Sequence, residues 1–295
     1  MTGTSLSSQQ IQLGLKQNWW QFWLLVLINA LVGGMIGLER TILPQIAKED
    51  FGIHSNTTIL SFIIVFGLAK SITNYITGIL ADRFGRKNIL IMGWLIGIPV
   101  PFILMGAESW AWIVFANVLL GINQGFTWSS TVVMKIDLVG DKERGFAMGL
   151  NEFAGYVAVA LSALATSYIA DRYGVRPYPF YLGIGFAGVG LLFSFLFVRD
   201  TAQHVKAETA DSDQPMLKNA TIETTWSHKN LGSVTQSGFV NNLNDAMVWG
   251  ILPIVLLEQG YSLKQVGLIT ALYPAVWGLS QLFTGRLSDH ICKKH

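Results

Sequence analysis

The stretch Thr77-Gly-Ile-Leu-Ala-Asp-Arg-Phe-Gly-Arg-Lys87 nearly recurs at the end of the chain, as Thr284-Gly-Arg-Leu-Ser-Asp-His-Ile-Cys-Lys-Lys294. The threonine, the first glycine, the leucine, the aspartate and the final lysine are identical in the two copies. Each copy follows an apolar run of about 20 residues, the length of helix that spans a bilayer. A short polar turn between two membrane-length segments, present twice, indicates that the chain contains an internal repeat.

The composition is that of a membrane protein. Hydrophobic residues make up 51% of the chain and charged residues 13%, whereas a soluble domain carries roughly 25% charged residues. The 30 glycines and 10 tryptophans are typical of helices that pack in lipid and are anchored at its interfaces. The single cysteine, Cys292, excludes a disulfide framework and a cysteine-rich metal site. A net charge of +2 gives no indication of a nucleic-acid partner, and we expect none.

Eight segments are apolar and long enough to cross a bilayer. They lie near residues 19–46, 57–77, 88–106, 110–136, 145–169, 179–198, 233–257 and 264–284. A polar stretch separates the first six from the last two. The sequence therefore predicts three regions, which are an N-terminal six-helix transmembrane bundle (1–198), a cytoplasmic linker (199–230) and a partial C-terminal bundle with helices seven and eight (231–295).

The distribution of lysine and arginine predicts the orientation. If the amino terminus is cytoplasmic, the positive charges of the outer loops are only Lys48, Arg172, Arg176 and Lys264. The inner loops and the N-terminal tail then carry Lys16, Arg83, Arg86, Lys87, Lys142, Arg144, Arg199, Lys206, Lys218, Lys229, Arg286, Lys293 and Lys294. Such an excess is typical of the cytoplasmic side. Both copies of the repeated turn then face the cytoplasm.

The first copy, Gly78 to Lys87, resembles the signature loop of the major facilitator superfamily, Gly-x-Leu-Ala/Ser-Asp-Arg/Lys-x-Gly-Arg-Lys/Arg, between its second and third helices. The second copy resembles the loop between helices eight and nine, from which His290 and Cys292 depart. The resemblance covers essentially the whole chain. It implies an all-α membrane protein with a complete N-terminal six-helix bundle and the first two helices of the C-terminal bundle.

The resemblance also implies a function. We expect secondary-active transport of a small solute by rocker-switch alternating access in the cell (inner) membrane, with protons as a candidate coupling ion and with no cofactor. Because the family fold needs two six-helix bundles, we expect the remaining helices to come from the full-length protein, and no transport by this chain alone. The alternative is a non-transporting membrane protein, either a sensor or an inactive truncated remnant. An enzyme is not expected, because no catalytic motif or paired metal-ligand spacing occurs.

In the family, the signature loop is a cytoplasmic latch that holds the two halves together. The resemblance implies that role for Gly78, Asp82, Arg83, Gly85, Arg86, Asp137, Gly285 and Asp289. Glycines permit a tight turn and the close approach of helices, and an aspartate can cap a helix end or pair with a cation. We expect Arg86 to reach Asp137, and Lys87 only to fix the topology.

Ionisable residues inside membrane spans cost at least ~2.5 kcal/mol each, so they are candidates for function. Glu39 and Arg40 lie late in the first span, where the family often places a cavity carboxylate; both can face protein only if that helix is surrounded on two sides. The alternative is a pair of charges at the outer interface. Lys70 and Glu152 fall at similar depths in the second and fifth spans and are a candidate buried pair.

Asp245 lies near the predicted midplane of the seventh span, and Asn241 shares its helix face. Polar groups at this depth are where such repeats bind substrate or a coupling ion, and the alternative is hydrogen bonding between helices. In helices seven and eight alone, we expect this polar face to lack partners. Two features of the family's drug/proton antiporters are absent, namely an arginine in helix four, where Gly121 stands, and a Gly-Pro pair in helix five. The sequence therefore predicts no substrate class.

Overall fold

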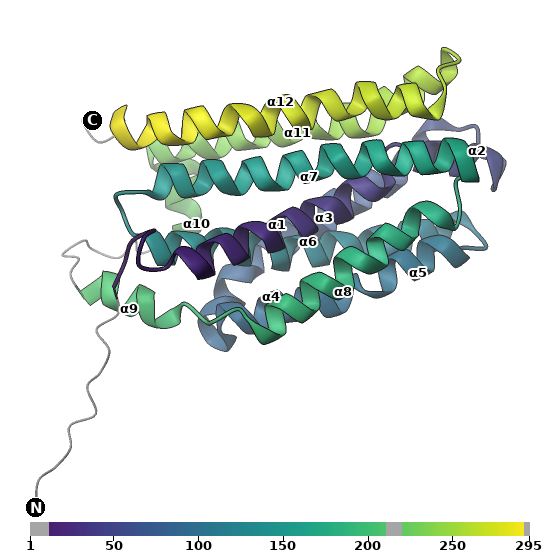
Figure 1. Cartoon of the computed structure of the whole chain (residues 1–295). Helices are drawn as coiled ribbons and strands as arrows, with labels where there is room; N and C mark the ends of the chain where they lie inside the picture. Colours follow the sequence, from purple (N-terminus) through teal and green to yellow (C-terminus); the bar gives the residue numbers. More distant parts are fainter. Residues whose placement is uncertain (1–11, 211–219, 292–295) are drawn as a thin grey trace, which may run out of the picture.

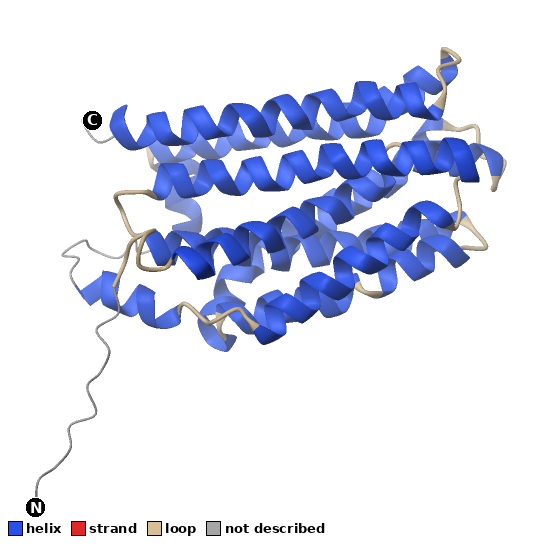
Figure 2. Ribbon diagram, viewed as in Figure 1, coloured by secondary structure: helices blue, strands red, loops and turns tan. Residues whose placement is uncertain are grey.

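The computed structural model describes residues 12–210 and 220–291, and within those ranges it contains helices and loops but no strand. Figures 1 and 2 show long helices that lie side by side along a common direction and are joined at their ends by short turns. The first six predicted spans correspond to α1 (Trp19–Arg40) with α2 (Leu43–Glu49), α3 (Asn56–Phe84), α4 (Arg86–Gly97) with α5 (Pro99–Gly106), α6 (Trp110–Val139), α7 (Arg144–Tyr173), and α8 (Tyr181–Leu196), which follows a single turn, η1 (Tyr178–Phe180).

The remaining elements lie in the predicted linker and after it. They are α9 (Ala202–Ala210), α10 (Ala220–Ile222), η2 (Glu223–Ser227), α11 (Lys229–Glu258) and α12 (Leu263–Ile291). The linker predicted at 199–230 is thus partly helical in the portion that the structure describes. Its boundaries, and the division into two bundles, stay predictions.

Two of the spans are interrupted once, and a proline lies in the first turn of the second piece of each. Pro44 lies in the first turn of α2, and Pro99 is the first residue of α5. Proline lacks the backbone N–H that a helix interior needs but fits the first turn, where that group has no partner in the helix. The chain therefore bends at these prolines.

The first copy of the repeated motif is mostly helical, so the prediction of a short polar turn over the whole stretch is wrong. α3 continues to Phe84, α4 begins at Arg86, and only Gly85 separates them. Gly85 has a φ of 87°, which glycine adopts without the steric penalty of a side chain. The second copy likewise continues α12 to Ile291, and Cys292, Lys293 and Lys294 lie outside the described residues.

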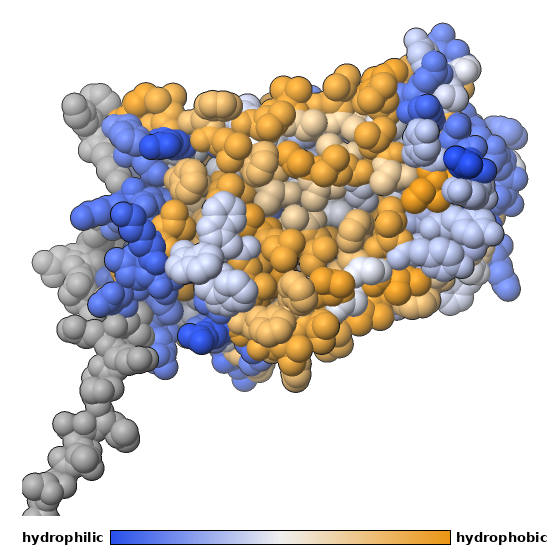
Figure 3. Space-filling view, in the orientation of Figure 1, coloured by the Kyte–Doolittle hydropathy of each residue, from blue (hydrophilic) through white to orange (hydrophobic). Residues whose placement is uncertain are grey.

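The described surface has the pattern of a multi-pass membrane protein. Figure 3 shows an apolar band between two hydrophilic ends. Within the described residues, seven helical spans are long and apolar enough to cross a membrane. The exposed Trp19, Trp20 and Trp23 lie at the start of α1, as is typical of side chains at the lipid–water interface.

One of the eight predicted spans, α6, is not among those seven, although it is 30 residues long. Asn117, Asn123 and Gln124 lower its hydropathy, and all three are buried. The amide of Asn123 donates to the Gly93 carbonyl of α4 at 2.8 Å, and that of Gln124 to the Val32 carbonyl of α1 at 3.0 Å. α6 therefore directs these amides toward neighbouring helices, where they find acceptors.

α12 lies along α7, so a helix that follows the linker packs on a helix that precedes it (Figure 1). The approach is close because small residues face each other. A Cβ added at Gly285 would lie 2.6 Å from the Gly145 carbonyl oxygen and 2.8 Å from the Gly149 Cα. Such contacts between backbones are characteristic of helices that associate in membranes.

Candidate functional site

Asp245 lies half-way along α11 and is 5% exposed. The Tyr156 hydroxyl of α7 donates to its Oδ2 at 2.7 Å, and the Tyr273 hydroxyl of α12 donates to its Oδ1 at 2.5 Å. The expectation that this polar face would lack partners is therefore wrong for Asp245, because tyrosines on two neighbouring helices supply them. A single carboxylate links helices from both sides of the linker.

Glu39 and Arg40 end α1, and their side chains are 0% and 1% exposed. Two adjacent residues can both be buried here because α1 is surrounded, by α7, α6, α8 and α11. The Asn117 amide donates to Glu39 Oε2 at 3.2 Å, while Arg40 Nη1 lies 3.7 Å from Glu39 Oε1. The interface position considered as an alternative does not fit this burial.

The Arg40 guanidinium is surrounded by aromatic rings. Its central carbon lies 4.2 Å from the ring centroid of Phe66, and 5.7 Å from those of Phe62 and Trp249. Within the part of the chain that the structure describes, none of its three nitrogens has a hydrogen-bond partner. Ring faces attract a cation but offer its N–H groups no strong acceptor.

Lys70 and Glu152 are half-buried on α3 and α7, but they are not a contact pair, since no ion pair joins them within 4.0 Å. The Lys70 ammonium instead lies 5.4 Å from the Trp128 ring centroid and 5.8 Å from that of Phe66. The Glu152 carboxylate accepts from the Asn151 amide at 2.8 Å. No direct ion pair joins them in the described residues, but the two charges lie close enough to attract each other, so the buried pair stays a prediction.

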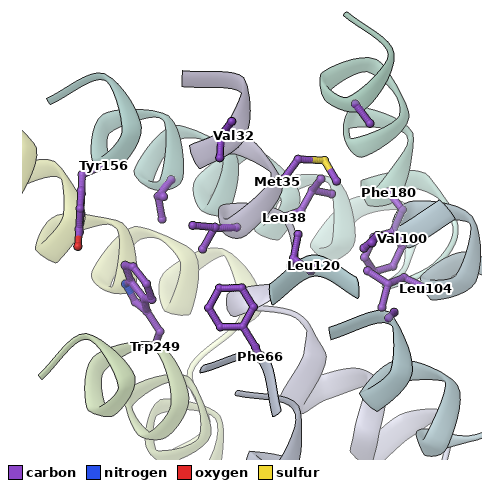
Figure 4. Close-up of a cluster of buried hydrophobic side chains, with 14 of the residues drawn as sticks. Val32, Met35, Leu38, Phe66, Val100, Leu104, Leu120, Tyr156, Phe180 and Trp249 are labelled. Atoms are coloured by element: carbon purple, nitrogen blue, oxygen red, sulfur yellow. The ribbon is translucent and has the colours of Figure 1, made fainter. Parts of the chain in front are cut away.

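A cavity of about 430 Å³ lies between α3 and α11. Its polar wall includes Lys70, Asp245 and Asn242, and its apolar wall includes Phe66 and Trp249. Figure 4 shows Tyr156 and Trp249 at one side of the buried apolar cluster, Phe66 near its middle, and Val100, Leu104 and Phe180 at the other side. Asn241 is half-buried and is not part of the wall, so Asn242 takes the place predicted for it.

The cavity is bounded at one end by direct packing of α3 on α11. A Cβ added at Gly250 would lie 3.0 Å from the Leu60 side chain and 3.4 Å from that of Ile63. At the same end, Glu258 accepts from the Asn56 amide at 3.1 Å and lies 3.9 Å from the Lys48 ammonium. The cavity therefore lies on the other side of this contact, toward the end of the helices that carries the repeated motif.

The motif residues of the first copy form an ion-pair network at that end. Arg86 lies 3.1 Å from the Asp82 carboxylate and 3.0 Å from that of Asp137, which is the reach expected from the sequence. The Thr201 hydroxyl also donates to Asp137, at 2.5 Å. Arg83 stays outside this network, exposed and over the ring of Phe84.

The start of the linker is held against the same loop. The Asp200 carboxylate accepts from the backbone N–H of Lys87 at 3.0 Å, in the first turn of α4. The Lys87 ammonium donates to the Phe195 carbonyl of α8 at 2.9 Å. Lys87 therefore does more than fix the topology, because its two nitrogens join α4 to the end of α8 and to the linker.

The two copies of the motif are used differently. The Asp289 carboxylate accepts from the backbone N–H groups of Gly145 and Phe146, both at 2.8 Å, and so caps the start of α7. Gly285 makes the close approach to α7, whereas nothing lies within 4 Å of a Cβ added at Gly78. The expected close helix contact at Gly78 is absent from the described residues, because Gly78 lines an open groove between α3 and α6.

Comparison with known sequences agrees with this architecture. The sequence model described as "Major Facilitator Superfamily" matches residues 22–294. The chain belongs to the Major Facilitator Superfamily. Its members are membrane transporters rather than enzymes, so the chain is a multi-pass membrane protein of a transporter family.

Relatives of this major facilitator chain include proteins named "Multidrug resistance protein MdtG". Those of Salmonella arizonae and Salmonella typhi are each 25% identical to it over 304 aligned positions, which cover 97% of this chain and 70% of the relative. A crystal structure described as that of "the human organic anion transporter MFSD10 (TETRAN)" matches with a TM-score of 0.63. It is 15% identical and covers 90% of this chain and 71% of that one, so this likeness concerns the fold alone.

Several residues of this major facilitator site were missed by sequence reasoning. Tyr156 and Tyr273 could not be predicted as site residues from the sequence, because an aromatic residue in an apolar span usually packs against neighbouring side chains. Asn117 did carry a signal, since an amide in the middle of a membrane span needs a partner. Lys135 carried the strongest one, because it is an ionisable residue inside a span, 1% exposed, and its ammonium donates to the Leu25 carbonyl at 3.3 Å.

Proposed function

We propose that the protein is a secondary-active transporter that moves a small solute by rocker-switch alternating access. The observation that carries this proposal is the buried hydrogen bond between Tyr156 and Asp245. It joins α7, which precedes the linker, to α11, which follows it, beside a cavity of suitable size for a small solute. A motion of one bundle against the other would change the surroundings of this carboxylate.

The coupling ion that we propose is the proton. Glu39 and Asp245 are buried carboxylates within membrane-spanning segments, where a change of protonation alters the net charge of the site at low dielectric. Each of them already accepts a hydrogen bond from a neutral donor, Asn117 in one case and tyrosine in the other. Glu39 Oε1 has no hydrogen-bond partner among the described residues, so it offers a place at which a proton could bind.

We further propose that the amino terminus is cytoplasmic and that the protein lies in the inner membrane of a cell, because the excess of positive charge lies with that end. The second bundle would then be completed by helices outside residues 1–295, in keeping with the 70% coverage of the Salmonella relatives. The division of the chain at 199–230 and the latch role of the motif belong to the same proposal.

Transport into proteoliposomes by the native-length protein tests this proposal. With an imposed pH gradient, we expect solute movement to be accompanied by proton movement in the wild type, and proton dependence to be lost in Glu39→Gln. Glu108→Gln, which removes a charge from an exposed loop, is the control and should behave as the wild type. A protein that binds solute but never moves it would favour the sensor alternative.

A further inference from the structure

The two cations at the central site are Arg40 and Lys70, and neither forms a hydrogen bond to a carboxylate of the described residues. Arg40 has Glu39 at 3.7 Å, beyond hydrogen-bond distance, and within the described residues its three nitrogens find no acceptor. Lys70 makes no hydrogen bond or ion pair in the part of the chain that the structure describes, and lies instead near the rings of Phe66 and Trp128. The three Arg40 nitrogens are buried without an acceptor, which is costly, and Lys70 lines the cavity, so both groups would gain from an added anion.

The carboxylates of the same site, in contrast, each accept at least one hydrogen bond. Asp245 accepts from two tyrosine hydroxyls, and Glu39 accepts from Asn117. All three donors are neutral; they supply a partner to both oxygens of Asp245 and to one oxygen of Glu39, whose Oε1 has no hydrogen-bond partner among the described residues. The unmet hydrogen-bonding capacity of the site thus lies mainly with its donors, which favours a ligand that supplies acceptors.

The remaining wall of the cavity is aromatic. Phe66, Trp249 and Phe239 line it beside Lys70. Phe66 separates Arg40 from the cavity, with 4.2 Å between the guanidinium and the ring centroid. Lys70 is therefore the cation that a ligand can contact directly, and Arg40 contributes its positive charge from behind the ring.

We propose that the cavity between α3 and α11 binds a small organic anion with a flat apolar body. Its anionic group lies at Lys70, in the field of Arg40, and its body packs on Phe66 and Trp249. This names the substrate class of the transport site and rests on the proposed function. A hydrogen bond to a charged group contributes about 1.5–3 kcal/mol, which corresponds to a difference in affinity of about tenfold or more between an anion and its neutral counterpart.

Binding of three matched probes to the native-length protein in lipid nanodiscs tests the proposal. The probes are naphthalene-2-carboxylate, its neutral carboxamide and naphthalen-2-ylmethylamine, which share one apolar body and differ in charge. We expect the carboxylate to bind about tenfold more tightly than the amide, and the amine to bind least tightly. Lys70→Gln should bring the carboxylate and the amide to equal affinity, while Lys70→Arg should retain the preference and so show that the position still folds.

Arg40→Gln should weaken carboxylate binding severalfold, and Arg172→Gln, at an exposed arginine on the last turn of α7, should leave it unchanged. Equal affinity for the three probes, a preference for the amine, or the absence of binding would each overturn the proposal. If the amine is preferred while the native-length protein still couples solute to protons, only the substrate class is wrong. If no coupled transport is found either, the proposed function falls as well.

Discussion

Asp289 caps the start of α7: its carboxylate accepts hydrogen bonds from the backbone N–H groups of Gly145 and Phe146, both at 2.8 Å. Asp82, its counterpart in the first copy, has a side chain that is 75% exposed and, among the described residues, pairs with Arg86, one turn further along the chain. Two copies of one motif thus have different partners in this structure. The second copy fixes α12 to α7, whereas the first stabilises the loop between α3 and α4.

Removal of the Asp289 carboxylate should therefore destabilise the chain. We expect Asp289→Ala to lower the free energy of unfolding by about 1–2 kcal/mol, the usual cost of a lost helix cap, with α12 released before the first six spans unfold. Thermal denaturation of the purified chain in detergent measures the change. Asp82→Ala is the matched control and should change stability much less; equal losses in the two variants would contradict the assignment.

The two motif glycines make a second matched pair. In Gly285→Ala the new Cβ would lie 2.6 Å from the Gly145 carbonyl oxygen, so α12 must move away from α7, at a cost of about 1–3 kcal/mol. In Gly78→Ala the Cβ meets open space, and the higher helix propensity of alanine adds up to ~1 kcal/mol of stability. In the same denaturation assay we expect Gly285→Ala to lower the stability and Gly78→Ala to raise it. A destabilising Gly78→Ala would show that this groove is filled in solution.

Asp82 should support the conformational cycle rather than substrate affinity. It does not line the cavity between α3 and α11 and belongs to the Arg86 network at the end of the helices. In the native-length protein, Asp82→Asn should therefore lower the rate of transport strongly and leave equilibrium binding within a few fold of the wild type. Transport at the wild-type rate in this variant would refute the latch role.

Cysteine accessibility should distinguish the two central carboxylates. In a background that lacks Cys292, Asp245→Cys lines the cavity and should react quickly with a small aqueous thiol reagent. Glu39→Cys, at a position with no exposed area in this conformation, should react slowly unless transport opens the site. Bound solute should protect Asp245→Cys, and complete inertness of both cysteines would show that neither lines an aqueous path.

The sequence by itself determined the class of fold and the positions of the spans, for a physical reason. A bilayer requires about 20 apolar residues in each helix, so hydropathy along the chain marks the helices wherever their neighbours lie. The repeated motif could also be recognised from the sequence alone. The same holds for the turn at Gly85, because glycine adopts a positive φ without a steric penalty. The polar centre of α6 can also be recognised in the sequence, because amides such as Asn117 are rare inside membrane helices.

Only the tertiary structure decided which polar groups meet. Lys70 and Glu152 have the right depth for a pair, yet the rotation of α3 directs the ammonium toward aromatic rings. Tyr156 and Tyr273 reach Asp245 from helices far away in the sequence. The depth of a residue in the membrane follows from its position along the chain. The direction in which its side chain points depends on how its helix is rotated relative to its neighbours. That rotation is set by the packing of small and large side chains along the whole length of the helices.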